Sequence, residues 1–160
     1  QRQMCIRDRT RTVLASYSIY GPLLLLVAAA YIPSHGLKPA ILSLLPLLLL
    51  QMLLCMVLGY ALAILAAALR DVAQLVGFLL SVGIYLSPIL FPIQLFPEAW
   101  RWVLWLNPMT GLVVGYQQVL LQGQWPHWTV WCATLMWVGV LAVVLNALVA
   151  RSRDQLVDWL

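Results

Sequence analysis

The chain has 160 residues, of which 64% are hydrophobic and only 9% are charged, whereas an ordinary soluble domain is about 25% charged and about 45 to 50% apolar. This composition excludes a soluble globular domain and a disordered segment. Nine basic residues against five acidic ones are too sparse to form the basic stripe of a nucleic-acid-binding protein, so no nucleic-acid partner is expected.

The first eleven residues differ in character from the rest of the chain. The opening QRQMCIRDR resembles a translated sequencing adapter and joins abruptly to an apolar block. A segment of that origin carries no fold information. We therefore separate residues 1–11 from residues 12–160, which form one transmembrane domain.

Charged residues divide that domain into four uncharged blocks, which cover residues 12–37, 39–69, 72–97 and 102–150. A helix needs about 20 residues to cross the roughly 30 Å of membrane hydrocarbon. Each of the first three blocks therefore has room for one membrane-spanning helix, and we predict these spans at residues 13–32, 41–65 and 74–91.

The chain between the third and last spans is broken into two short apolar pieces. Residues 97–106 would form a helix of about 15 Å and residues 108–121 one of about 21 Å, so neither can cross the membrane alone. Proline lacks an N–H group and begins a new helix at its first position, which places a turn at Asn107 and Pro108. We predict a re-entrant pair of short helices on the outer face, followed by the fourth span at residues 127–149. The fold class is an all-α membrane protein with four transmembrane helices.

Basic residues in the short loops predict the orientation, because cytoplasmic loops carry an excess of Lys and Arg. With four spans, the side that carries the two ends of the chain holds Arg2, Arg7, Arg9, Arg11, Arg70, Arg151 and Arg153, and four of these remain without the opening nine residues. The opposite side holds only Lys38 and Arg101. Both ends are therefore predicted to be cytoplasmic.

The sequence contains no pattern typical of catalysis, metal binding or ion coupling. None of the four predicted spans contains a charged residue, and ion-coupled carriers need ionisable groups within the membrane. His35 and His127 have no Asp, Glu or Cys at metal-ligand spacing. A GxxxxGK[ST] nucleotide-binding loop is also absent. If the chain transports a substrate, another chain must supply the energy, and no cofactor is expected in this one.

Tryptophan is concentrated near the predicted outer face, at Trp100, Trp102, Trp105, Trp125, Trp128 and Trp131. An interfacial aromatic belt explains most of these side chains. Trp102, Trp105 and Tyr116 lie on the short helices, and they are candidates for stacking against sugar rings. Gly111 and Gly115 are four residues apart, a spacing that favours close helix packing.

Several motifs occur together in a characteristic order: Arg70-Asp71, SPILFP at residues 87–92, PEAWRWVLWLNPMTG at residues 97–111, and the tail RSRDQLVDWL. In this respect the chain, from about residue 12 to its end, resembles the permease subunit of ABC-2 type transporters. It is most similar to the branch that exports polysaccharides such as O-antigen, capsule and teichoic acid.

The resemblance implies a role for each motif. It places Ser87, Pro88 and Pro92 at the end of the third span, and Arg70 and Asp71 in a cytoplasmic loop. It makes the two short outer helices gate helices, with functional residues at Pro97, Glu98, Arg101, Asn107, Pro108 and Thr110. Many relatives carry Glu and Arg on the second gate helix, where this chain has Val114 and Gln117.

The resemblance also implies partners and a location. Family members have six spans, act as dimers and bind two ABC ATPase subunits, which hold ATP and Mg. This chain would then be the C-terminal two-thirds of a homodimeric inner-membrane subunit that moves a lipid-linked glycan, such as a lipopolysaccharide precursor. One alternative is an ABC-2 permease for a small lipid, drug or other hydrophobic cargo. Another is an integral-membrane enzyme acting on lipid-linked sugars, with Asp71, Glu98 or His127 as acid or base.

Overall fold

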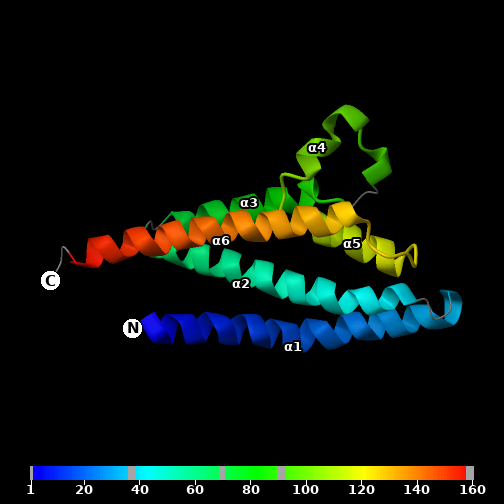
Figure 1. The fold of residues 1–160 in the computed structure, drawn as a ribbon, viewed down its shortest axis with the longest axis horizontal. Helices are drawn as coiled ribbons and strands as arrows, with labels where there is room; N and C mark the ends of the chain where they lie inside the picture. Colours follow the sequence, from blue (N-terminus) through cyan, green and yellow to red (C-terminus); the bar gives the residue numbers. More distant parts are fainter. Residues whose placement is uncertain (1, 36–38, 69–70, 90–92, 158–160) are drawn as a thin grey trace.

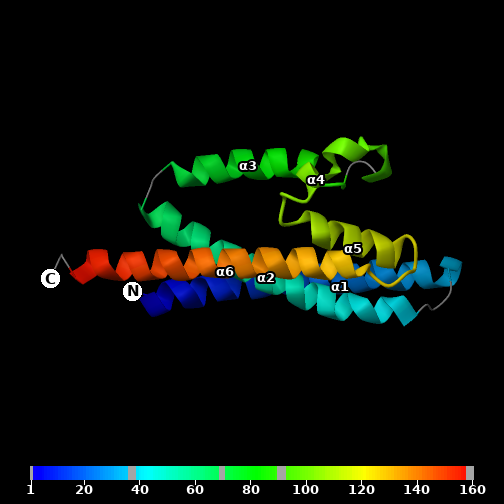
Figure 2. The ribbon, with the colours of Figure 1, turned by 45° about the horizontal axis from the view of Figure 1, so that its top comes forward.

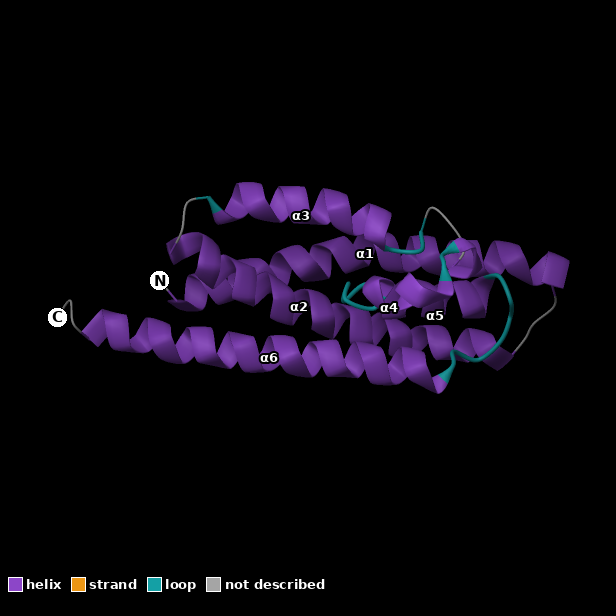
Figure 3. Cartoon of the chain, turned by 90° about the horizontal axis from the view of Figure 1, so that it is seen from above, coloured by secondary structure: helices purple, strands orange, loops and turns teal. Residues whose placement is uncertain are grey.

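The computed structural model describes residues 2–35, 39–68, 71–89 and 93–157. Every regular element in these ranges is a helix, and Figure 3 shows only helices and loops there. Two of the predicted functional residues, Arg70 and Pro92, lie outside the described ranges. The elements in chain order are α1 (Arg2–His35), η1 (Pro39–Ser43), α2 (Leu44–Ala68), α3 (Val72–Leu86), η2 (Ile93–Leu95), η3 (Glu98–Trp100), α4 (Arg101–Leu104), α5 (Thr110–Leu120) and α6 (Trp128–Val157).

The long helices run back and forth along one axis. In Figure 1, α1, α2, α3 and α6 lie lengthwise, and the two ends of the chain lie at the same end of the bundle. The short helices α4 and α5 lie toward the opposite end. Figure 2 shows α3 standing apart from the group formed by α1, α2 and α6. That both ends of the chain face the cytoplasm stays a prediction.

Among the residues that the structure describes, three helices are long and apolar enough to cross a membrane. Their apolar windows are Thr10–Val27, Pro39–Ala66 and Trp128–Arg151. These windows overlap the predicted first, second and fourth spans. The apolar side chains of these three helices are largely exposed, because at most 22% of each apolar window is buried inside the structure. A soluble protein would not expose so much apolar surface, so the chain is a membrane protein.

The helix in the third block is shorter than predicted. Helix α3 has 15 residues and a length of about 22 Å at 1.5 Å per residue. It ends at Leu86, five residues before the predicted end, because Ser87 precedes a proline and is therefore disfavoured in helical geometry. Ser87 is extended, with φ −94° and ψ 141°. A third span that reaches residue 91 stays a prediction.

The first short helix also differs from the prediction of one helix at residues 97–106. The structure has a 3-10 turn in η3 followed by a single α-helical turn in α4. The chain then tightens, with i to i+3 hydrogen bonds from Trp105 N to Trp102 O and from Leu106 N to Val103 O. Pro108 disfavours helical geometry at Asn107 and so prevents continuation. The second short helix, α5, lies within the predicted residues 108–121.

The core lies between α2, α5 and α6. Leu47, Leu54, Leu112 and Val130 are almost completely buried there. Two glycines let α5 lie close to its neighbours: a Cβ atom on Gly111 would lie 2.6 Å from Thr134 Oγ1, and one on Gly115 would lie 3.0 Å from Val130 Cγ1. The prediction that these glycines serve close packing is confirmed.

Candidate functional site

The turn before α5 is held together by its own side chains. Asn107 Oδ1 accepts a hydrogen bond of 3.0 Å from Met109 N, a local contact typical of Asn in turns. Thr110 is fully buried, and its hydroxyl donates to Leu104 O at 2.5 Å. Pro108 lies between them in the turn, and α5 begins two residues later at Thr110, so the prediction that this proline occupies the first position of the second helix is wrong. The structure therefore brings together the predicted turn residues Asn107, Pro108 and Thr110.

Two side-chain amides connect this region to α3. Asn107 Nδ2 donates to Gly83 O at 2.9 Å, and Gln117 Nε2 donates to Pro88 O at 2.6 Å. Ser87 and Pro88 are buried, whereas α3 itself has no buried residue. The predicted end of the third span therefore contacts both the turn and the second short helix.

In the sequence, Gln117 stands out only as a departure from the charged residues of relatives. The structure gives it a structural role, because an uncharged amide can donate to a carbonyl oxygen without placing a charge in a partly buried site. The sequence could have pointed to Gln117 only through its position on the short helix, one residue after Tyr116. It did not identify Pro88 as the hydrogen-bond partner of Gln117.

Glu98 and Arg101, two of the predicted gate-helix residues, form an ion pair at the start of α4. Arg101 Nη1 lies 3.2 Å from Glu98 Oε1, and Arg101 Nε donates to Phe96 O at 3.1 Å. Glu98 is 87% exposed, so solvent screens the ion pair and leaves it a small contribution to stability. Pro97 is exposed and precedes this turn. The pair orients the entry to α4 rather than forming a buried charge site.

The three aromatic candidates for sugar stacking do not lie together. Trp102 is 61% exposed on α4. Trp105 is half-buried, and its carbonyl oxygen accepts a 3.0 Å hydrogen bond from Trp137 Nε1 of α6. Tyr116 instead faces α1 and α2, where its hydroxyl donates to Gln51 Oε1 at 2.6 Å. Figure 1 shows α4 on the side of α5 away from α1. A single platform of all three rings is therefore not formed.

The groups required by the enzyme alternative are also dispersed. Asp71 is exposed, directly precedes α3 and makes no side-chain cap. Helix α3 begins toward the end of the bundle where the termini lie (Figure 1). Glu98 and His127 belong to the opposite end. His127 Nδ1 lies 3.1 Å from Thr129 Oγ1, and within the described ranges no three His, Cys, Asp or Glu side chains form a group that could hold a metal ion.

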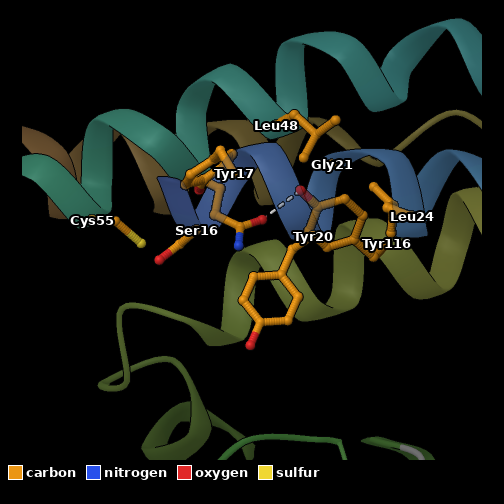
Figure 4. A pocket seen from close by; sticks show the side chains of 9 residues that line it. Ser16, Tyr17, Tyr20, Gly21, Leu24, Leu48, Cys55 and Tyr116 are labelled. Carbon is orange, nitrogen blue, oxygen red and sulfur yellow. Dashed lines mark hydrogen bonds between the residues drawn. The ribbon is translucent and has the colours of Figure 1, made fainter. Parts of the chain in front are cut away.

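A cavity that sequence reasoning missed lies between α1, α2 and α5 (Figure 4). Its volume is about 340 Å³, and it is lined by Ser16, Tyr17, Tyr20, Gly21, Leu24, Leu48, Gln51, Cys55 and Tyr116. Neither Trp102 nor Trp105 is among its lining residues. Helical spacing was the available signal, because residues 16, 20 and 24 follow one face of α1, while residues 48, 51 and 55 follow one face of α2.

Comparison with known proteins identifies the family of this helical membrane chain. The family model described as ABC-2 type transporter matches residues 9–121, which is more than half of the chain. The chain belongs to the ABC-2 type transporter family. A curated relative, the O-antigen export system permease protein RfbA of Myxococcus xanthus, is 28% identical over 138 residues, which cover 84% of this chain. No solved structure gives a significant match.

The family match confirms the resemblance that the motifs indicated, and the relative belongs by its name to the polysaccharide-export branch. This ABC-2 permease spans about half the length of the curated relative, since the alignment covers 50% of that protein. The matched region contains most of α1 and all of α2, α3 and α5, together with the turn at Asn107 and Pro108. The candidate site therefore lies inside the part that defines the family.

Proposed function

We propose that this ABC-2 permease is the transmembrane subunit of an ATP-driven exporter that moves a lipid-linked polysaccharide or glycolipid across the bacterial inner membrane. The observation that carries the cargo class is its 28% identity, over 84% of the chain, to a permease named for O-antigen export. A separate ABC ATPase subunit binds ATP and Mg, and two permease copies enclose the path. Both ends of the chain face the cytoplasm.

The contacts of α5 support a gating role for the short helices. Helix α5 is packed against α2 and α6 through buried residues, including Gly111 and Gly115. Asn107 ties the same region to α3, and Gln117 ties it to Pro88, two residues beyond the end of α3. Helix α3 itself buries no residue, so little packing opposes its movement relative to the core between α2, α5 and α6. A movement of α3 caused by ATP binding in the partner would be transmitted to α5 through these two amides.

Trp102 and Trp105 stay our candidates for glycan stacking at the exit. An exposed indole presents a flat apolar face without charge, and aromatic contacts of this kind are worth about 1 kcal/mol each. Contacts of that strength hold a sugar ring briefly and release it again, which suits a polymer that must keep moving. Tyr116 belongs to a different surface, the cavity between α1, α2 and α5.

Complementation tests the proposed function. The full-length permease gene, expressed with its neighbouring ATPase gene in cells that lack the permease, should restore surface glycan. An ATPase variant without its Walker lysine should not restore it, and lipid-linked glycan should accumulate inside the cell. In the same assay, a permease that carries both Trp102→Ala and Trp105→Ala should give less surface glycan than the unchanged permease. Trp125 is an exposed tryptophan in the loop after α5, and Trp125→Ala should leave surface glycan unchanged.

Two results would contradict the proposal. Surface glycan that is unchanged without the permease would exclude glycan export. If the permease instead confers resistance to a hydrophobic drug, the alternative of a small hydrophobic cargo is correct. Normal surface glycan with both tryptophans absent would exclude the aromatic exit path but leave the permease function intact.

A further inference from the structure

The cavity between α1, α2 and α5 contains polar groups that have spare hydrogen-bonding capacity. Gln51 accepts the hydroxyl hydrogen of Tyr116 through Oε1 (dashed line in Figure 4), and its Nε2 has no hydrogen-bond partner among the described residues. The buried Tyr17 hydroxyl has no hydrogen-bond partner of ordinary geometry there, although it interacts with the weakly polar thiol of Cys55. A buried polar group is usually satisfied, so the Tyr17 hydroxyl favours an additional polar ligand. The amide nitrogen of Gln51, which is half-buried, offers a second hydrogen-bond donor in the same cavity.

The lining excludes a charged ligand. None of the nine described side chains around the cavity carries a charge, and α1 and α2 are two of the helices long enough to span a membrane. An ion brought to this depth without a charged partner would carry a large desolvation cost. The ligand that fits is therefore uncharged and rich in hydrogen-bond donors and acceptors.

The shape and composition of the cavity favour a sugar attached to a lipid. Its volume of about 340 Å³ lies at the lower end of the roughly 300 to 1,000 Å³ range of small-molecule sites. Tyr20 and Tyr116 provide aromatic rings, and Leu24 and Leu48 provide apolar surface beside them (Figure 4). Tyr20 is 65% exposed, so a lipid can approach from the surroundings of α1.

We propose that this cavity binds the uncharged sugar headgroup of a glycolipid. The amide nitrogen of Gln51 donates to a sugar hydroxyl, the Tyr17 hydroxyl exchanges a hydrogen bond with another, and the ring of Tyr20 covers one face of the sugar. Tyr116 belongs to α5, so the bound headgroup contacts the helix that carries the proposed gate. The inference rests on the proposed function in taking the glycolipid to be cargo.

Thermal unfolding of the full chain in phosphatidylcholine nanodiscs tests the binding site. Monoglucosyl diacylglycerol should raise the unfolding midpoint by roughly 5 °C or more at saturation, because a ligand that binds only the folded state stabilises it. Diacylglycerol, which lacks the sugar, and anionic phosphatidylglycerol should produce less than half of that rise. An equal rise with all three lipids, or none with the glucolipid, would overturn the proposal.

Two variants locate the effect in the cavity. Gln51→Leu should reduce the glucolipid shift by more than half, whereas Gln74→Leu, the same substitution at an exposed position of α3, should retain it. Tyr20→Ala is a second cavity variant. Because the Tyr20 side chain is exposed, removing it should leave the unfolding midpoint measured without glucolipid unchanged. It should, however, reduce the rise of the midpoint that the glucolipid causes. A shift that persists in both cavity variants would place the sugar elsewhere and overturn the proposal.

Export measurements separate this inference from the proposed function. If Gln51→Leu loses the glucolipid shift and also lowers surface glycan, the cavity holds cargo. If it loses the shift while surface glycan is normal, the binding site is supported but its identification with cargo is overturned. If the glucolipid shift is absent while complementation restores surface glycan, the cavity proposal fails and the export function stands.

Discussion

At the scale of single residues, small side chains in α5 control how closely this helix approaches α6. Gly111 is buried against Thr134, whose hydroxyl donates to Val130 O at 2.8 Å within α6. That hydrogen bond fixes the hydroxyl at the surface that Gly111 contacts. A side chain at position 111 would have to displace it or push the two helices apart.

We expect Gly111→Ala to destabilise the chain by about 1 to 3 kcal/mol, the usual cost of overpacking, because its Cβ would lie 2.6 Å from Thr134 Oγ1. Gly139→Ala is the matched control, since no heavy atom outside its own helix lies within 4 Å of a Cβ there. Thermal unfolding in nanodiscs measures the difference. Equal midpoints for the two variants would show that α5 does not need this close approach.

Sequence separation explains which contacts of the site residues could be predicted from the sequence. Asn107 and Pro108 form a local turn, so their role follows from neighbouring residues alone. Gln51 and Tyr116 are 65 positions apart and meet through a hydrogen bond. A contact of that kind depends on how α2 and α5 pack, and no local pattern specifies it.

At the scale of helices, the important relation is between α3 and the short helices that follow it. Proline and the residue before it end α3 at Leu86 and leave the Pro88 carbonyl free of an α-helical partner. Gln117 supplies that partner from α5. The segment that directly follows α3 is thus held by a side chain of α5, which couples the positions of the two helices.

We expect Gln117→Leu to reduce surface glycan in the complementation assay, because it removes the donor to Pro88 O and leaves that buried carbonyl unsatisfied at a cost of about 1 to 3 kcal/mol. Gln122→Leu is the control, since Gln122 is exposed in the loop after α5. Protein abundance should be measured alongside export. Normal export by Gln117→Leu at normal abundance would exclude coupling through this hydrogen bond.

At the scale of the whole molecule, the arrangement of helices supports the predicted topology. The long helices alternate in direction, and the ends of the chain lie at one end of the bundle (Figure 1). The segment between α3 and α6 lies toward the other end. A chain with this arrangement can keep both ends on one side of a membrane only if α4 and α5 do not together cross it.

Thiol labelling tests that topology. In a chain whose own cysteines at positions 5, 55 and 132 are replaced by serine, Gln122→Cys should react with an impermeant maleimide added to intact cells, and Arg151→Cys should react only after the membrane is opened. Position 122 is exposed in the loop after α5, and position 151 is exposed on α6. Labelling of Arg151→Cys in intact cells would exclude the re-entrant arrangement of the short helices.

The sequence by itself determined the membrane class, three of the long helices and the family, because these depend on uninterrupted apolar length and on motifs that are local in the chain. It also indicated the break at Asn107, since proline acts on its immediate neighbours. Only the tertiary structure decided that the Tyr116 side chain faces α1 and α2 and does not face Trp102. It also decided that the Gln117 side chain reaches the Pro88 carbonyl. A nearly uniform apolar helix can be buried on any face, so the packing of neighbouring helices, and not hydrophobic periodicity, selects which side chains meet.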